Sequence, residues 1–390
     1  MPNVKVGVGL SRDPDTQGAA RAALHDALEQ AELERAPWAL CFFTGAHLPR
    51  ADIIRRTLLD GSGCESLCGC SAVGVVGRGE EVEGGAGLTV MVGASPALEA
   101  LSRMLPEDGA GLAGLSDAAQ RRGGRPLLIA LPDSYVVDNT VLRDRLESEV
   151  PEIPVYGAGS TDDGQLSISL QLGMEGVRSR SIAVLGLCGN LEVATGISQS
   201  CQAVGEPHFI TQSKAFTLVE LDGRPALGAF VAQCKALGME SMQQAAQEVL
   251  FGFPLDASNP RFTGESCLVR PLAGFDQASH GLVVPYPFKT HSTMGFMHRN
   301  ADTAERDMAR MVDDCAARLS GPPDFGLYFD CAARGTGLYG RSGVDSGLIR
   351  RRLGDFPLIG MFGGFELATP LGVPQVYTYT GVLVLVRVDA

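Results

Sequence analysis

The sequence predicts an α/β protein made of two related halves of mixed β-sheet flanked by helices. Two observations carry this prediction. Strand-like apolar segments alternate with amphipathic helix-like segments along the chain. Three stretches also repeat one unit, in which a strand, a turn, a short amphipathic segment and a second strand end in a glycine-rich turn. From the first strand to the glycine that closes the second, these stretches run Ala39 to Gly69, Leu127 to Gly157 and Gly326 to Gly360.

The spacing of the three stretches predicts a shared structural role for their glycine turns. The gaps are 30, 30 and 34 residues. A glycine that follows a strand has no Cβ and tolerates positive φ, so backbone can come close to another group there. Three such turns at the ends of related strands predict a common pocket.

The first half contains the first two stretches and several further elements. A strand is expected at Val4–Leu10 and a helix at Gln17–Glu34, whose Leu24, Leu28 and Ala31 share one face. The other expected elements are a strand at Leu88–Ala94, a helix near Ser116–Arg121, a hairpin of Leu166–Leu172 with Ser181–Leu187, and strands at Leu191–Ser198 and Phe216–Leu221.

A β-rich region ends near residue 225, and an amphipathic helix-like segment follows it. This change predicts the main domain boundary, with domains of residues 1–225 and 226–390. The second half then echoes the first, which predicts an internal duplication of the strand–turn–helix–strand–glycine-turn unit. Its expected elements are helices at Ala226–Leu237 and Ser241–Leu250, a strand at Ser292–His298, a helix that opens on Asp302 and Glu305, and closing strands at Val376–Thr380 and Val382–Val388.

Composition narrows the possible partners. The net charge of −13 and the pI near 5.0 argue against nucleic acid and against an anionic membrane surface. The densest basic cluster, Arg350-Arg351-Arg352, is expected to be a solvated helix face. The sequence has no run of 18 or more apolar residues, so no transmembrane helix is expected, and the first residues do not resemble a signal peptide. A cytoplasmic protein is expected, whose ten cysteines are reduced and mostly buried.

Several familiar catalytic and cofactor motifs are missing from the sequence. The segment Gly69–Gly74 reads GxSxxG, one residue longer than a serine-hydrolase elbow. There is no phosphate loop, no dinucleotide-binding glycine motif and no histidine pair at metal-ligand spacing. Cys64, Cys68 and Cys70 have the spacing Cx3CxC, which is not that of a zinc or thioredoxin site. No metal site is therefore expected.

Two strand ends carry reactive or charged residues. Cys331 ends an apolar strand three residues before Arg334, and a nearby guanidinium favours a thiolate. The alternative is a buried strand-end cysteine, with Arg334 paired to an acid. Glu366 follows the third glycine turn, where a carboxylate needs a partner such as Arg334 or a ligand amine. Asp162 and Asp163 have either a similar role or only a turn-forming role.

These turns resemble those of the FIST sensory family, in both its N-terminal and its C-terminal domain. The resemblance covers about residues 30 to 390. The segments that carry it, in order, are LCGCSAVGV (Leu67–Val75), VYGAGSTDDG (Val155–Gly164), ELDGRPAL (Glu220–Leu227), LYFDCAARG (Leu327–Gly335), LIGMFGGFEL (Leu358–Leu367) and YTGVLVL (Tyr379–Leu385). The boundary near residue 225 then separates a FIST N-terminal-like from a FIST C-terminal-like domain.

The resemblance implies a cytoplasmic sensor for a small, amino-acid-like ligand that feeds a signalling output. No kinase, cyclase or methyl-accepting segment is left in the chain, so the output is expected to pass through a separate signalling protein such as a kinase or cyclase. Some relatives in the family are described as haem-containing nitric-oxide sensors, which makes haem a possible cofactor although the residues give no reason to expect one.

The leading hypothesis is therefore a non-enzymatic ligand-binding module. Backbone donors at the glycine turns, hydroxyl groups, and the opposite charges of Arg334 and Glu366 would hold an amino acid or a small acid. The expected ligand-binding residues are Cys70, Ser71, Gly159, Ser160, Thr161, Asp163, Cys331, Arg334, Gly335, Gly363 and Glu366.

Two alternatives stay open. A haem-binding nitric-oxide sensor needs an axial ligand in an apolar pocket, for which His291 and His298 are the best candidates, although a histidine on an apolar face is more often structural. A thiol sensor or enzyme that depends on Cys331 would need a base, and no histidine stands nearby in the sequence.

Overall fold

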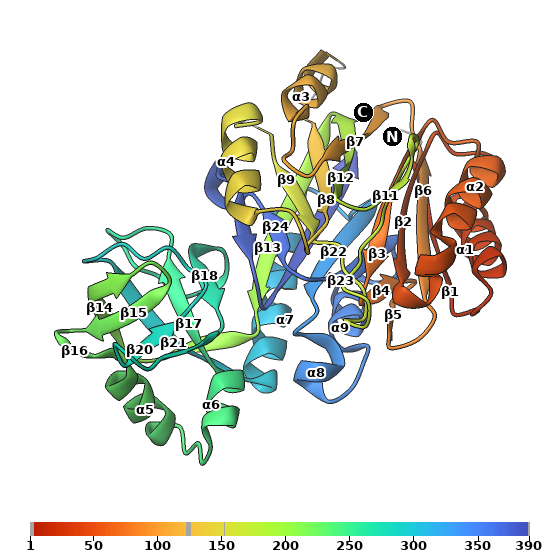
Figure 1. The fold of residues 1–390 in the computed structure, drawn as a ribbon. Coiled ribbons are helices and arrows are strands. Elements are labelled where there is room, and N and C mark those ends of the chain that lie inside the picture. The colour runs from red at the N-terminus through yellow and green to blue at the C-terminus, as the bar shows by residue number, and fades with distance from the viewer. Residues whose placement is uncertain (1–3, 122–125, 152, 389–390) are drawn as a thin grey trace. The chain divides into compact units, whose positions relative to one another are not determined.

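The computed structural model describes residues 4–121, 126–151 and 153–388, which form two compact units (Figure 1). The first unit comprises the residues up to Gly196, Ala309–Val376 and the residues from Thr380 onward. The second comprises Ile197–Met308 and Tyr377–Tyr379, so its chain is inserted into that of the first. The two compact units interleave along the chain. The predicted boundary at residue 225 between two consecutive domains stays a prediction.

One arrangement of elements, called a repeat below, occurs three times, mainly within the first compact unit. Each repeat is an outer strand, a helix, a first central strand, a helical segment, a second central strand, a pair of short strands and a closing strand. Repeat 1 is β1 (Lys5–Ser11), α1 (Thr16–Ala31), β2 (Trp38–Thr44), η1 (Gly45–Arg50), α2 (Ala51–Ser62), β3 (Ser66–Ala72), β4 (Gly74–Gly77), β5 (Glu80–Glu83) and β6 (Leu88–Ala94).

The other two repeats follow the same order. Repeat 2 is β7 (Leu98–Pro106), α3 (Leu112–Arg121), β8 (Leu127–Pro132), α4 (Asn139–Glu149), β9 (Val155–Ala158), β10 (Gln171–Gly173), β11 (Gly176–Arg178) and β12 (Ser181–Gly189). Repeat 3 is β13 (Leu191–Gln199), α7 (Ala301–Ala317), β22 (Phe325–Cys331), α8 (Gly335–Tyr339), α9 (Val344–Leu353), β23 (Leu358–Gly363), β24 (Glu366–Ala368), η3 (Pro370–Gly372), β25 (Gln375–Tyr377) and β26 (Thr380–Val388). The predicted α/β class and its repeated unit are confirmed, and the unit occurs three times.

The three repeats share one strand order. Their sheets contain β1-β6-β2-β3, β7-β12-β8-β9 and β13-β26-β22-β23. In each sheet the two central strands are parallel, as in β2 with β3, β8 with β9 and β22 with β23. The closing strand runs antiparallel to the first central strand. The three stretches found in the sequence are therefore these parallel pairs with their connecting helices.

The pair of short strands of each repeat extends the sheet of another repeat. The hairpin β4–β5 of repeat 1 extends the sheet of repeat 3 through β23, and β10–β11 of repeat 2 extends that of repeat 1 through β3. The strands β24 and β25 of repeat 3 extend the sheet of repeat 2 through β9. This cyclic exchange makes three six-stranded sheets and joins the repeats by main-chain hydrogen bonds.

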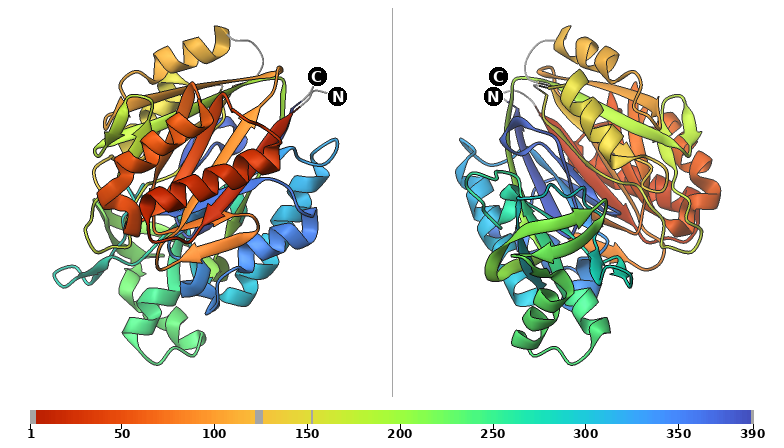
Figure 2. Two further views of the ribbon diagram at one scale, coloured as in Figure 1. Left: turned by 90° about the vertical axis from the view of Figure 1, so that its right-hand side faces the viewer. Right: turned by 60° about the vertical axis from the view of Figure 1, so that its left-hand side comes forward.

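The central strands are buried on both faces, which explains their continuous apolar sequences. The helices α1 and α2 lie side by side over one face of the repeat 1 sheet (Figure 2, left), where they cover a core that includes Phe43. On the opposite face Phe42 packs edge-on against Phe329 of repeat 3, with ring centroids 6.3 Å apart. The sheets thus pack against each other with their helices outside.

The second unit is built on an eight-stranded antiparallel sheet. Its core lies beneath α5, where Phe230 stacks on Phe251 at 5.9 Å. Its elements are β14 (Cys201–Lys214), β15 (Thr217–Leu221), β16 (Arg224–Pro225), α5 (Ala226–Ala236), α6 (Met242–Glu248), β17 (Val249–Pro254), η2 (Gly264–Ser266), β18 (Cys267–Arg270), β19 (Gly274–Asp276), β20 (Gly281–Val283) and β21 (Thr293–Arg299).

Two sequence-based elements were wrong. The predicted hairpin of Leu166–Leu172 with Ser181–Leu187 does not form, because Gln171–Gly173 pairs with Gly176–Arg178 and with β3, and β12 pairs with β7 and β8. The helix predicted to reach Leu250 ends at Glu248, and the chain continues as β17. In both cases pairing with a distant strand overrides a local pattern.

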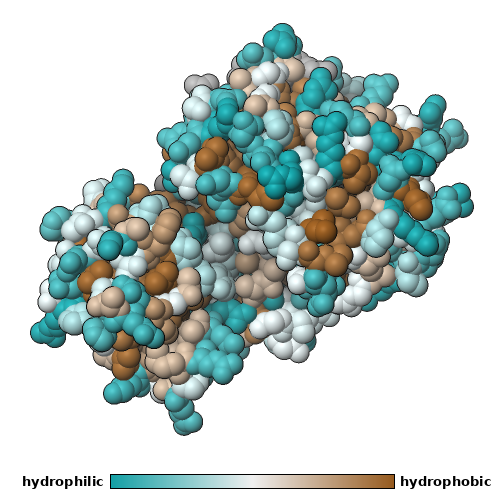
Figure 3. Space-filling view, viewed as in Figure 1, coloured by the Kyte–Doolittle hydropathy of each residue, from teal (hydrophilic) through white to brown (hydrophobic). Residues whose placement is uncertain are grey.

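Within the described part of the chain, no helix is both long and apolar enough to cross a bilayer. Polar side chains occupy much of the face shown in Figure 3, with apolar side chains in small groups between them. Among the large apolar residues of the described chain, Leu166 and Phe209 are the most exposed, at 58% each.

Three glycines occupy equivalent positions in the three parallel pairs. Gly69 pairs with Cys41, Gly157 with Ala130 and Gly360 with Tyr328. A Cβ at each glycine would lie 2.3, 1.9 and 2.3 Å from the carbonyl oxygen of its partner. These are the closing glycines of the three sequence stretches, and each lets two strands approach where a side chain would separate them.

Replacing Gly360 by alanine should therefore lower the free energy of unfolding by about 3 kcal/mol, since backbone on both strands would have to move. The matched control is Gly114→Ala on the exposed face of α3, where an added Cβ meets nothing within 4 Å. That change should stabilise the protein by up to about 1 kcal/mol. Urea unfolding measures both, and equal effects would contradict the steric explanation.

Candidate functional site

The glycine turns that the sequence singled out come together in the first unit. The amide of Thr161 donates to the carbonyl of Ser71 over 3.2 Å. Gly159 exchanges hydrogen bonds with the third turn, donating to Phe365 over 2.8 Å and accepting from Gly364 over 2.9 Å. The ends of the three parallel pairs therefore meet at one junction. The common pocket that the spacing of the stretches predicted there stays a prediction.

Register places three other residues at equivalent positions beside this junction. The residues that follow the three glycines pair with the exchanged strands: Cys70 with Gln171, Ala158 with Glu366, and Met361 with Val75. Val75, Gln171 and Glu366 are thus the same position in the three repeats, and all three are fully buried. The position is apolar in repeat 1, an amide in repeat 2 and a carboxyl in repeat 3.

Each of these three residues meets the start of a closing strand. The Ser181 hydroxyl donates to Oε1 of Gln171 over 2.9 Å, and the Thr380 hydroxyl donates to Oε2 of Glu366 over 2.6 Å. In repeat 1 the corresponding residue is Gly87, where a Cβ would lie 3.0 Å from a methyl group of Val75. The same contact, between the exchanged strand and the start of the closing strand, is therefore apolar in repeat 1 and a hydrogen bond to an amide or a carboxyl group in repeats 2 and 3.

Only the repeat 3 form leaves a polar atom without a partner. The Gln171 amide nitrogen donates to the hydroxyls of Ser160 and Ser169, so repeat 2 is satisfied. By contrast, Oε1 of Glu366 has no nitrogen or oxygen donor among the described residues. A buried polar atom without a partner is costly, and such atoms in native proteins commonly mark a site with another role.

Burial governs the charge of Glu366. Loss of hydration raises the pKa of its carboxyl to about 8, although hydrogen bonds from Thr380 and Cys331 oppose the shift. The carboxyl is therefore largely protonated at neutral pH. It can release its proton when a cation or a donor arrives, which is the behaviour expected of a binding or proton-accepting group.

A second buried cluster lies at the end of β22 and in the helical segment that follows it. Arg334 bonds Asp330 through Nε at 2.9 Å and Asp345 through Nη2 at 2.8 Å, and none of the three is more than 1% exposed. The Tyr328 hydroxyl donates to Asp345 over 2.9 Å, and the Tyr339 hydroxyl lies 2.8 Å from both Nη2 of Arg334 and Oδ1 of Asp345. Arg334 is thus held between two carboxyl groups.

The polar atoms of this cluster are not all satisfied either. Nη1 of Arg334 and Oδ2 of Asp330 lack partners within the described structure. Burial raises the pKa of Asp330 well above its usual range, and Asp345 and Glu366 add to the shift although Arg334 opposes it. Burial alone would lower the pKa of Arg334, but Asp345 and the neighbouring acidic groups raise it well above normal. The guanidinium therefore stays charged.

The exchanged hairpin of repeat 1 fixes the helices that carry this cluster. Glu81 accepts from the amides of Gly343 and Ser346, at 2.6 and 2.8 Å, at the start of α9. Glu83 accepts from the amide of Thr336 over 3.0 Å at the start of α8. Gly335 has a φ of 53°, and a Cβ there would lie 2.3 Å from Glu83. The geometry of the Arg334 cluster therefore depends on two repeats.

The other predicted residues have structural contacts at the junction or lie at its edge. The Ser71 hydroxyl accepts from the amide of Leu170 over 3.1 Å, and the thiol of Cys70 lies 3.5 Å from the sulfur of Met361. A Cβ on Gly363 would lie 2.7 Å from that of Ala158. Asp163 is exposed, and its carboxylate accepts from Gln165 within its own turn.

The two histidines proposed for haem are in the second unit. His291 is exposed on a turn with a φ of 68°, and Nε2 of His298 lies 3.6 Å from a carboxylate oxygen of Glu248. Neither setting fits an axial ligand that presents a free ring nitrogen inside an apolar pocket. The haem alternative stays a prediction without structural support.

Family models of known proteins match most of the chain. A FIST N domain matches residues 37–224, and a FIST C domain matches residues 229–369. The chain belongs to the FIST family. FIST domains are associated with sensory roles in signal transduction and with the binding of small ligands.

Two mycobacterial proteins resemble this FIST protein over nearly its whole length. Uncharacterized protein Rv0628c of Mycobacterium tuberculosis is 26% identical over 386 residues, which cover 98% of this chain and 99% of the relative. Uncharacterized protein Mb0898c of Mycobacterium bovis is 25% identical over 386 residues, with 98% of each chain covered. Their names describe no ligand.

Sequence reasoning missed the partners that define the site of this FIST protein. Asp330 stands in the quoted motif LYFDCAARG, and a carboxylate within an apolar strand was a usable signal. Thr380 opens the closing strand and could have been recognised only with the pairing known. Asp345 and Tyr339 lie in the helical segment after β22, which carried no pattern that points to Arg334.

The raised pKa of Glu366 predicts how stability depends on pH. An unfolded glutamate titrates near about 4.3, so between that pH and about 8 the folded state holds a proton that the unfolded state has lost. The free energy of unfolding should fall as pH rises through this window, by at most about 1.4 kcal/mol per pH unit from this group.

The measurement is chemical denaturation of the wild type and Glu366→Gln from pH 5 to 9. The glutamine copies Gln171 and keeps an acceptor for Thr380. The stability of the wild type relative to the variant should decrease with pH and level off above about pH 8. A difference that does not change with pH would show that Glu366 has an ordinary pKa.

Loss of the guanidinium at Arg334 should be far more damaging than loss of an exposed one. Arg334→Met leaves Asp345 and Asp330 buried without their cation and should lower the free energy of unfolding by about 3–5 kcal/mol. Arg352→Met is the control, since its 2.7 Å ion pair with Asp313 is half exposed. That variant should change stability by less than about 1 kcal/mol. Similar losses would contradict the assigned role of burial.

Proposed function

We propose that this chain is a sensory module that binds a small amino-acid-like ligand through its ammonium group, where β22 ends and β24 begins. The observation that carries the proposal is Oε1 of the fully buried Glu366 carboxyl, which has no nitrogen or oxygen donor among the described residues. The equivalent residues are the apolar Val75 and the fully hydrogen-bonded Gln171. An ammonium group supplies both the missing hydrogen bond and the positive charge.

Charge favours an ammonium over a simple acid as the ligand group at this point. The buried carboxyls of Asp330, Asp345 and Glu366 lie near a single guanidinium, that of Arg334. Arg334 already bonds two of these carboxyls. A bound anion would gain nothing from these carboxyl groups, whereas an ammonium would favour the ionised form of Glu366 and pair with it. The remaining Nη1 of Arg334 is a donor that could serve the carboxylate of the same ligand.

Burial of the site supports a sensory role. Glu366, Asp330 and Arg334 have no exposed surface. A ligand reaches them only when a neighbouring segment moves, so binding selects a conformation that a separate signalling protein, such as a kinase or cyclase, can recognise. The α8–α9 segment is a candidate for this movement, because Glu81 and Glu83 hold it through side-chain contacts.

A screen of proteinogenic amino acids, their decarboxylated amines and their deaminated acids tests the ligand class. Thermal shift identifies binders, and calorimetry measures their Kd. We expect an amine-bearing compound to bind and its deaminated acid not to bind, and we expect Glu366→Gln to weaken binding at least about tenfold.

Asp163→Asn is the matched control, because it makes the same chemical change on an exposed turn of the same junction. It should leave the Kd within about twofold, as is usual for a surface change. The proposal is wrong if no amine-bearing compound binds, if the deaminated acids bind as well, or if the two variants lose affinity equally.

The thiol alternative has less support. Arg334, the cation proposed to activate Cys331, bonds Asp330 and Asp345, and the thiol is a hydrogen-bond partner of Glu366. A neighbouring carboxyl group does not favour a thiolate. Cys331 is also only 4% exposed. A thiol sensor or enzyme therefore stays a secondary prediction.

A further inference from the structure

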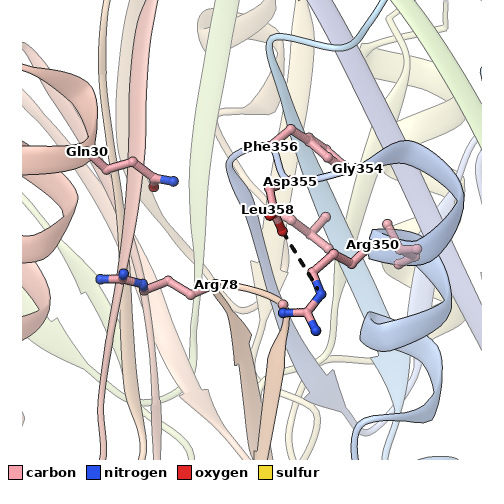
Figure 4. Close-up of a pocket in the computed structure, with 9 residues that line it drawn as sticks. Gln30, Arg78, Arg350, Gly354, Asp355, Phe356 and Leu358 are labelled. Carbon is pink, nitrogen blue, oxygen red and sulfur yellow. Dashed lines mark ion pairs between the residues drawn. The ribbon is translucent and has the colours of Figure 1, made fainter.

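A separate cavity lies at the opposite end of β23 from Glu366. It has a volume of about 300 Å³ and lies within the first unit (Figure 4). Its lining comes from α1 and the β4–β5 turn of repeat 1, and from α9 and the start of β23 in repeat 3. The lining includes Gln30, Arg78, Ile349, Arg350, Asp355 and Leu358.

The exchange of the β4–β5 hairpin creates this cavity. Gly77 pairs with Ile359, so the turn that follows at Arg78 and Gly79 lies beside Leu358. Gly79 has a φ of 74°, and its missing side chain leaves room for Arg350, whose Cδ lies 3.0 Å from the position of a Cβ. Arg350 is thereby guided across the turn toward the cavity.

The polar lining is cationic and rich in donors. Arg78 is anchored by Asp26, 3.0 Å from its guanidinium. Gln30 accepts from the amide of Val8 over 2.7 Å through Oε1, which leaves its amide nitrogen as a donor. Figure 4 shows the side chains of Gln30 and Arg350 pointing into the space between α1 and α9.

The acid that faces Arg350 is easily displaced. Asp355 lies 4.0 Å from Nε of Arg350, and its side chain is 91% exposed. So long and exposed an ion pair contributes little to stability. A ligand carboxylate could bind the guanidinium in two places and exclude water more completely. The inner wall is apolar, since Ile349 and Leu358 are buried.

We propose that this cavity binds a small carboxylate with an apolar body, whose carboxylate pairs with Arg350. The cluster Arg350-Arg351-Arg352, expected from the sequence to be a solvated face, is thus divided. Only Arg350 lines the cavity, while Arg352 pairs with Asp313. The site is independent of Glu366, so its success or failure is distinguishable from that of the proposed function.

Titration of the full chain with benzoate, followed by protein NMR, tests this site. Arg350→Ala should weaken benzoate binding at least about tenfold, since a charge-assisted hydrogen-bond pair is lost. Arg351→Ala removes the adjacent arginine of the same helix, outside the cavity, and should change the Kd by less than about twofold. Glu366→Gln should bind as the wild type does.

Three results would each overturn the proposal. These are no binding of benzoate by the wild type, an equal loss of affinity in the two arginine variants, or binding of acetate as tight as that of benzoate. The last result would show that the apolar wall contributes nothing, because acetate carries the carboxylate without a body to fill the cavity.

Discussion

Main-chain pairing between repeats is the constraint on which the rest of this structure depends. Each second central strand, β3, β9 and β23, is completed by a short strand from a different repeat. The exchange places the glycine turns of all three repeats at one junction, and it brings Glu81 and Glu83 to the helices of repeat 3. Neither the junction nor the Arg334 cluster would form in an isolated repeat, because each would lack partners for its buried polar groups.

Internal repetition also provides a comparison within one molecule. Val75, Gln171 and Glu366 share one position, and only Glu366 combines burial with a polar atom that lacks a donor. The fold clearly accepts an apolar pair or a satisfied amide there, so the carboxyl is not required for packing. A costly group at a position that tolerates inexpensive ones is a physical reason to assign it a function. The same reasoning separates Arg334, a matched charge, from Arg350, a weakly paired one.

Local patterns predicted most strands and the extent of each parallel strand pair along the chain. The closing glycines Gly69, Gly157 and Gly360 mark equivalent positions in the three parallel pairs, and the expected convergence of the turns is found. The hairpin predicted at Leu166–Leu172 was wrong because residues 171–173 pair with β3, whose residues lie about a hundred positions away. No local signal encodes which strand a short exchanged segment will join.

The sequence alone determined the α/β class, the repeated unit and most residues at the junction, because hydrophobic periodicity and glycine placement are local properties. Tertiary structure decided which of those residues carry unmet charge or hydrogen-bonding capacity. Arg334 and Glu366 were both recognised as charged strand-end residues, yet Arg334 forms ion pairs with Asp330 and Asp345, while Oε1 of Glu366 has no nitrogen or oxygen donor in the described structure. That difference depends on burial and on partners far away in sequence, and electrostatic energies inside a protein follow from both.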